Sequence, residues 1–200
     1  QKVLYVSGEE SPQQIKLRSD RLGFAGDGVL MLPETDLVAV IDKMDSIRPG
    51  LVIVDSIQTL YSSDENSGPG SVGQVREAGR RLLRWAKDSG TPVFVSGHMT
   101  KDGSLAGPRV LEHMVDVVLY LESQEDGGFR VLRSGKNRFG ATTEVGVFEM
   151  TELGLTDVAD PSKALLSQRV GGAIGATLVP VVEGSRALLL EVQALTSPSQ

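Results

Sequence analysis

Leu-Val-Ile-Val-Asp-Ser, at residues 51–56, is the stretch that best predicts the fold. Its four consecutive apolar residues show no polar alternation, which is typical of a strand buried on both faces in a parallel sheet covered by helices. Asp55 follows at the carboxyl end of this strand, the edge of an open α/β sheet at which ligands bind. Its carboxylate is a candidate for holding Mg²⁺ through water, as in nucleotide-hydrolysing proteins. A strand-end aspartate that caps the next turn is an equal alternative.

The composition is that of an ordinary globular protein. The 200 residues are 40% hydrophobic and 23% charged, enough for one domain with a small appendage. Because the net charge is −6, any nucleic-acid-binding surface must be a local basic patch. The absence of cysteine excludes disulfides and cysteine–metal sites from this chain. With no apolar run of roughly 20 residues and no signal peptide, we expect a cytoplasmic protein without a membrane partner.

Predicted strands and capped helices alternate along the first two-thirds of the chain. The helices are predicted to begin at the caps Ser11, Thr35 and Ser71. The predicted strands are residues 3–7, 29–32, 51–55 and 92–97, followed by antiparallel strands at 115–122, 129–133 and 145–150. This pattern predicts an α/β fold, in which a mostly parallel sheet is flanked by helices and carries antiparallel strands at its edge.

The chain is also predicted to be a fragment. Its composition changes after residue 160, which indicates a core at 1–160, a linker at 161–172 and a hairpin at 173–200. Two strands alone are only marginally stable, so the hairpin would begin a second domain that the chain does not complete. The first strand starts within two residues of Gln1, and we interpret both ends as cut.

Two acidic residues, Glu9 and Glu10, leave the first predicted strand. In a sheet where this strand neighbours the strand ending in Asp55, the carboxylates lie at one edge. One glutamate could then polarise the water that attacks a γ-phosphate, although both also suit a helix start, where negative charge is stabilised. Ser56 and His98 follow strand ends at the same edge and are candidates for contacting a bound cofactor.

Lys136 and Arg138 are two cations separated by one residue after a predicted strand. In extended backbone they point the same way, so they could reach a phosphate, including one bound on a neighbouring subunit. Two solvated charges in a turn would show the same spacing.

Further basic residues adjoin two long loops, at residues 57–70 and 99–109, that leave the carboxyl edge of the sheet. Loops of this length are usually functional or mobile. Lys101 and Arg109 belong to the second loop and could contact a nucleic-acid backbone. Arg76 and Arg80, with Arg84 and Lys87, share one face of the helix after the first loop. That face could bind DNA or simply be solvated.

A phosphate-binding loop is absent from the sequence. Nothing in residues 1–200 matches Gly-x-x-x-x-Gly-Lys-Ser/Thr. A complete nucleotide site needs the backbone amides and the lysine of such a loop, which we expect to precede Gln1.

Several segments resemble the RadA (Sms) family of bacterial DNA-repair proteins, relatives of the RecA recombinase and of hexameric replicative helicases. The resemblance covers essentially the whole chain. Its most specific segment is Lys-Asn-Arg-Phe-Gly at residues 136–140, which equals the signature motif of this family. The other matching segments are residues 5–11, 51–61 and 107–116. A looser likeness to circadian-clock ATPases lies in residues 9–13.

The resemblance implies a RecA-like P-loop ATPase core that assembles into rings, expected to be hexamers. The family uses ATP and Mg²⁺ to drive branch migration on single-stranded and branched DNA beside a RecA-type recombinase. Asp55 would be the metal-side carboxylate, Glu9 or Glu10 the catalytic glutamate, and Lys136 with Arg138 would act on the next subunit's nucleotide. The two long loops would face DNA.

Two further implications concern regions beyond this core. Residues from about 170 onward resemble the start of the family's Lon-protease-like domain. The family's zinc finger and phosphate loop are not in this chain, so we expect this piece alone to carry no zinc and to bind ATP weakly.

Two other interpretations remain at this point. The chain could belong to another RecA-superfamily ring ATPase, of helicase or clock type. It could also be a non-catalytic fragment that only oligomerises or holds DNA, as the missing phosphate loop would allow.

Overall fold

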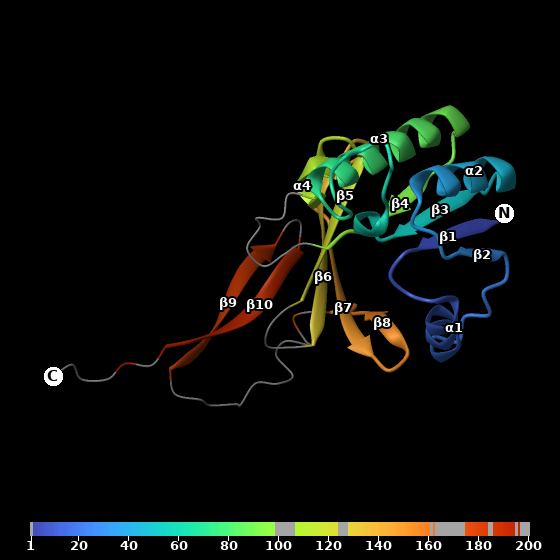
Figure 1. The fold of residues 1–200 in the computed structure, drawn as a ribbon. Helices are drawn as coiled ribbons and strands as arrows, with labels where there is room; N and C mark the ends of the chain where they lie inside the picture. Colours follow the sequence, from blue (N-terminus) through green and yellow to red (C-terminus); the bar gives the residue numbers. More distant parts are fainter. Residues whose placement is uncertain are drawn as a thin grey trace. The chain divides into compact units, whose positions relative to one another are not determined.

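The computed structural model describes residues 2–98, 107–123, 128–160, 162, 175–183, 186–194 and 196. The chain separates into two compact units, residues 1–115 and residues 116–200 (Figure 1).

The N-terminal unit is built on a four-stranded parallel sheet with the strand order β2-β1-β3-β4. Its strands are β1 (Val3–Ser7), β2 (Val29–Leu32), β3 (Leu51–Asp55) and β4 (Val93–Val95). Its helices are α1 (Pro12–Arg21), α2 (Leu37–Ile47), η1 (Ile57–Thr59), α3 (Val72–Ser89) and α4 (Gly107–Glu112). The strands predicted at these positions are confirmed, as is the α/β fold class.

The hydrophobic core lies on one face of this sheet. Val6 and Val54 are fully buried there against apolar residues of α2 and α3, which cover the same face (Figure 1). The opposite face is only half buried. Ile53 is partly exposed and Phe94 is 60% exposed, and α1 buries none of its residues. The prediction that the residue 51–55 strand is buried on both faces is therefore wrong for one face of the described structure, where Leu51 and Ile53 stay partly exposed.

The helix starts follow the predicted capping pattern with one difference. Ser11 and Ser71 cap α1 and α3, and each side chain accepts a hydrogen bond from an amide N–H of the first turn. The cap of α2 is Asp36 instead of Thr35, because the Asp36 carboxylate accepts from two first-turn N–H groups. Within the described helices, none is both long enough and apolar enough to cross a membrane.

The side chain of Gln74 forms hydrogen bonds along the loop at residues 57–70. Gln74, in the first turn of α3, is only 3% exposed. Its Oε1 accepts from the Ser62 N–H at 2.8 Å, and its Nε2 donates to the carbonyl oxygens of Ser62, Glu65 and Ser67 at 2.9–3.1 Å. The amide thus supplies hydrogen-bond partners to backbone groups along the loop, and buried polar groups need such partners.

We expect Gln74→Leu to destabilise the protein by about 2 kcal/mol, because the substitution leaves buried backbone groups without partners. Gln13→Leu, at an exposed position of α1, is the control and should change stability by less than about 0.5 kcal/mol. Urea unfolding measures both changes, and limited proteolysis should cut the Gln74→Leu variant faster between residues 62 and 68. Equal stability of the two variants would refute the role assigned to Gln74.

The C-terminal unit contains two antiparallel sheets. The larger has the order β5-β6-β7-β8, and the smaller is the β9–β10 pair. The strands are β5 (Val117–Ser123), β6 (Phe129–Asn137), β7 (Val145–Thr151), β8 (Gly154–Asp157), β9 (Ala176–Glu183) and β10 (Arg186–Gln193). A small core of Phe129, Val131, Val145 and Val147 lies on one face of the larger sheet.

One feature of the predicted sheet needs correction. The antiparallel strands form a sheet of their own and do not extend the edge of the parallel sheet in the described residues. The physical reason is that β5 to β8 each pair with their neighbour in sequence, whereas β4 is only three residues long. The hairpin expected within residues 173–200 is present as β9 and β10. The domain boundaries at 160 and 172 stay predictions.

Candidate functional site

The carboxyl ends of β1, β3 and β4 meet at one edge of the parallel sheet. The register pairs Ser7 of β1 with Asp55 of β3, and β4 continues beside β3 to Ser96, whose N–H donates to the Val54 carbonyl. Glu9 follows β1 within two residues. This arrangement brings four predicted site residues together at that edge: Glu9, Asp55, Ser56 and His98.

Asp55 is held by two hydroxyl groups. Tyr5 Oη donates to Asp55 Oδ2 at 2.5 Å, and Ser96 Oγ donates to Asp55 Oδ1 at 2.6 Å. Partial burial by itself would raise the pKa of Asp55, but the hydrogen bonds from Ser96 and Tyr5, followed by the electrostatic contributions of His98 and Arg18, outweigh it and lower the pKa. Burial, followed by the bond to Asp55, raises the pKa of the Tyr5 phenol. Asp55 is therefore an oriented, ionised carboxylate at neutral pH.

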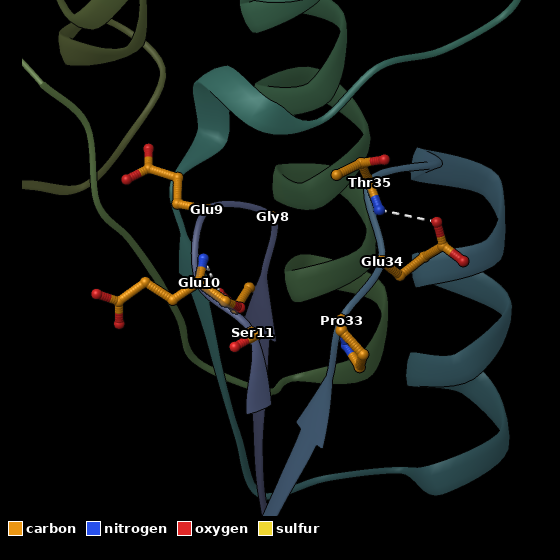
Figure 2. Close-up of a pocket in the computed structure, with 8 residues that line it drawn as sticks. Gly8, Glu9, Glu10, Ser11, Pro33, Glu34 and Thr35 are labelled. Carbon is orange, nitrogen blue, oxygen red and sulfur yellow. Dashed lines mark hydrogen bonds between the residues drawn. The ribbon is translucent and has the colours of Figure 1, made fainter. Parts of the chain in front are cut away.

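The structure separates the two glutamates that sequence alone left equivalent. Glu9 Oε1 accepts from Ser56 Oγ at 2.5 Å, and His98 Nε2 lies 3.1 and 3.2 Å from the two Glu9 carboxylate oxygens. Glu10 instead forms an ion pair with Arg18 of α1. Figure 2 shows the two side chains leaving the loop separately. Glu9 thus belongs to the cluster around Asp55, whereas Glu10 pairs with a residue of α1.

The donor atoms of this cluster suit a magnesium ion bound through water. They are carboxylate and hydroxyl oxygens, the ligand type that Mg²⁺ prefers, and Mg²⁺ usually keeps several waters and takes one or two carboxylates. Within the described ranges, no three residues among His, Cys, Asp and Glu are grouped so as to enclose a metal ion. Asp55, whose carboxylate is ionised, is the residue of this cluster that could hold such an ion through its waters.

A hollow of about 280 Å³ opens beside the cluster (Figure 2). The β1–α1 loop forms one wall and the β2–α2 loop the other. It is lined by Ser7, Gly8, Glu9, Glu10, Ser11, Pro33, Glu34 and Thr35. Gly8 is required here, because a Cβ at this position would lie 2.5 Å from Thr59 Cβ and 2.9 Å from Thr35 Cγ2.

Two residues of the cluster were not predicted from the sequence. Tyr5 and Ser96 orient Asp55, and neither was named as a site residue, although Tyr5 begins the matching segment at residues 5–11. A usable signal existed, since Tyr5 is the only residue with a polar group in the apolar run of residues 3–6. A hydroxyl inside a sheet usually indicates a partner on a neighbouring strand, because buried polar groups are hydrogen-bonded.

The two cations of the signature motif lie in the C-terminal unit. Lys136 is in β6, and Arg138 follows it directly. Arg138 is fixed by Asp116 in two ways: its guanidinium lies 2.7 Å from the Asp116 carboxylate, and its N–H donates to the Asp116 carbonyl at 3.0 Å. Asn137 Oδ1 accepts from the Phe139 N–H at 3.0 Å. The motif therefore folds as an ordered turn.

The remaining predicted contacts with DNA are placed only in part. Arg76 and Arg80 are exposed on α3, and Arg80 forms an ion pair with Glu77 at 2.7 Å. Hydrogen bonds from Arg80, and then from Arg81, lower the pKa of Glu77 to about 2 despite its partial burial. Lys101 lies outside the described residues. Arg109 lies in α4, but its side chain also lies outside them.

The parallel sheet, its helices and the carboxylates at neighbouring strand ends define an open α/β fold with a candidate ligand site at the carboxyl edge of the sheet. Two solved structures share this fold. The RadB recombinase has a TM-score of 0.56 at 24% identity, covering 78% of this chain and 79% of that chain. A KaiC-like protein from Pyrococcus horikoshii has a TM-score of 0.58 at 14% identity, covering 79% and 76%.

The chain belongs to the AAA domain family, whose profile matches residues 1–104. It is also similar to proteins called DNA repair protein RadA. The relative from Listeria monocytogenes is 52% identical over 198 residues, and that from Bacillus subtilis is 52% identical over 197 residues. These alignments cover 99% and 98% of this chain but 43% of each relative. The resemblance noted from the sequence is confirmed, and the chain spans less than half the length of these relatives.

Proposed function

We propose that this chain is part of an ATP-hydrolysing DNA repair and recombination protein. The observation that best supports the proposal is the cluster at the sheet edge, where Glu9 is held by Ser56 and His98 beside the ionised Asp55. Similarity to DNA repair protein RadA over nearly the whole chain supports a role in DNA repair. Phosphoryl transfer depends on positioning and charge, and this cluster offers both.

Each residue of the cluster has a role in this proposal. Magnesium-bound ATP would supply the γ-phosphate that water attacks. Asp55, oriented by Tyr5 and Ser96, would hold the metal's water ligands. Glu9 orients and polarises the attacking water as general base. Its hydrogen bonds to Ser56 and His98 keep the carboxylate in one place.

The proposed substrate is single-stranded or branched DNA, and the proposed work is branch migration beside a RecA-type recombinase. Arg76 and Arg80 are exposed on one face of α3 and would contact phosphates, together with Lys101 and Arg109. Phosphate contacts of this kind make binding salt-dependent. With DNA as the substrate, we propose the bacterial cytoplasm, at the nucleoid, as the place of action.

The proposal includes assembly into a ring, expected to be a hexamer. Lys136 and Arg138 would stabilise charge on the nucleotide of the next subunit, as arginine fingers do. Residues 1–160 would form the ATPase core, and residues 173–200, which contain the β9–β10 pair, would begin a Lon-protease-like platform for assembly.

The test is ATP hydrolysis by the whole protein, with and without single-stranded DNA. We expect DNA to raise the hydrolysis rate, and Asp55→Asn to remove hydrolysis in both conditions. We also expect residues 1–200 alone to hydrolyse little ATP, because they contain no phosphate-binding loop. An ATP hydrolysis rate that is the same with and without DNA would favour another ring ATPase, of helicase or clock type. No hydrolysis by the whole protein would favour a non-catalytic role in oligomerisation or DNA binding.

A further inference from the structure

The side chain of Gln58 connects η1 to the backbone that follows β4. Gln58 is the middle residue of η1, and its Nε2 donates to the His98 carbonyl at 3.3 Å. A Cβ at Gly97 would lie 3.4 Å from the same nitrogen. The amide of Gln58 therefore lies directly against the backbone of residues 97 and 98.

This connection bears on Glu9, because each of the two segments carries a side chain that contacts its carboxylate. Ser56, which precedes η1, donates through Oγ to Glu9 Oε1, and His98 Nε2 lies 3.1 Å from the same oxygen. A carboxylate only accepts hydrogen bonds, so His98 Nε2 is the donor. The His98 side chain is 68% exposed, so packing does little to hold its ring. The ring position depends on the backbone of residue 98, where Gln58 is bonded.

The other atom of the Gln58 amide does not help the fold. In the part of the chain that the structure describes, Gln58 Oε1 is buried and has no hydrogen-bond partner. Gln74 is different, because both atoms of its amide are paired with backbone groups. A buried acceptor without a partner destabilises a folded protein, so a leucine of similar size would suit position 58 better if packing alone decided the residue. Departures of this kind from the stable choice are expected at functional sites.

We propose that Gln58 is a positioning residue for Glu9: through the His98 carbonyl, its amide holds the imidazole on the Glu9 carboxylate. This inference rests on the proposed function, in which Glu9 is the general base, and it adds a residue that acts through another side chain. A general base must lie within hydrogen-bond reach of the water that it polarises, and a misplacement of about 1 Å can lower the rate roughly 100-fold. Gln58 therefore affects kcat and leaves the binding of ATP unchanged.

Chemical labelling of His98 tests this link without ATP. Diethyl pyrocarbonate acylates the ring nitrogens of histidine, and mass spectrometry of peptides from the whole protein gives the rate at each residue. While Nε2 is bonded to Glu9, only Nδ1, which is more hindered by the backbone, can react. We expect His98 to react several-fold faster in Gln58→Leu and in Glu9→Ala than in the parent. His113, the other histidine of residues 1–200, should keep its rate. An unchanged rate at His98 in Gln58→Leu would overturn the inference.

Thermal unfolding separates positioning from packing. We expect the Tm of Gln58→Leu to equal or exceed that of the parent, because the substitution removes the unpartnered Oε1. Gln74→Leu, in contrast, should lower the Tm. A clear fall in the Tm of Gln58→Leu would show that this side chain supports the fold instead of positioning Glu9.

ATP hydrolysis by the whole protein tests the consequence for the reaction. We expect Gln58→Leu to lower kcat roughly 10-fold with an unchanged KM for ATP. Gln13→Leu, at an exposed position of α1, should match the parent. When Glu9 is already glutamine, Gln58→Leu should cause no further loss, because residues that act as a unit are not additive. Losses that multiply, or a raised KM with a normal kcat, would contradict a role through Glu9.

The labelling requires no hydrolysis, so the two proposals fail separately. A whole protein that hydrolyses no ATP contradicts the proposed function, and the labelling rate of His98 then still decides whether Gln58 holds the ring. A DNA-stimulated ATPase in which Gln58→Leu leaves the labelling of His98 unchanged contradicts only the role of Gln58.

Discussion

Glu9→Gln is expected to lower ATP hydrolysis by the whole protein by roughly 100-fold or more, the usual contribution of a general base. Glu10→Gln should stay within a few-fold of the parent. The two residues are adjacent and chemically identical, so each variant is a matched control for the other. The expected difference comes from their partners. Glu9 is bonded to Ser56 and His98 beside Asp55, whereas Glu10 pairs with Arg18 of α1.

The measurement is the steady-state hydrolysis rate at saturating ATP, with thermal unfolding to show that each variant is folded. Glutamine keeps the shape and the acceptor oxygen of glutamate but removes its charge, so packing in the loop changes little. Equal losses in both variants, or a larger loss in Glu10→Gln, would show that the hydrogen bonds of Glu9 do not mark the catalytic carboxylate.

Lys136→Ala is expected to abolish DNA-stimulated ATP hydrolysis while leaving the fold intact. A cation that acts on a phosphate across a subunit boundary contributes roughly 1,000-fold or more to the rate. Arg130→Ala is the control, because Arg130 lies on the same strand, β6, outside the signature motif. Hydrolysis is measured with and without single-stranded DNA, and circular dichroism checks the fold.

Mixing two inactive variants tests whether Lys136 acts on the next subunit. A ring that contains Glu9→Gln and Lys136→Ala subunits has some boundaries at which both contributing residues are native, so partial activity should return. Near-normal DNA-stimulated turnover in Lys136→Ala alone would refute the role of this lysine. Absence of activity in the mixture, with both variants present in the same ring, would place Lys136 in its own subunit's site.

The sequence predicted the parallel part of the fold because its signals are local. The apolar run at residues 51–54 gives the β3 strand, and serine caps mark the starts of α1 and α3. The partners of the antiparallel strands were not predictable in this way. Strand pairing depends on contacts between distant segments, and alternation of side chains does not say which sheet a strand joins. The cap of α2 was placed one residue early because Thr35 and Asp36 are both good cap residues.

The charged residues of the site could be predicted from the sequence, but Tyr5 and Ser96, which orient Asp55, could not. Asp55 and Glu9 lie at the carboxyl ends of parallel strands, so the strand order alone places them at one edge of the sheet. The choice between Glu9 and Glu10 required the structure, because it depends on which carboxylate meets Ser56 and His98. The role of Gln74 was not predicted: its amide is turned into the preceding loop, where the buried backbone groups need partners.

Gly8 has a consequence for how the parts of this site can move. The glycine lies immediately before Glu9, and there is no room for a side chain between it and Thr59, the last residue of η1. The loop that carries the glutamate therefore rests directly on the segment that leads into residues 60–70. With no compressible group in the contact, a shift of Thr59 toward the sheet must displace the Glu9 backbone as well.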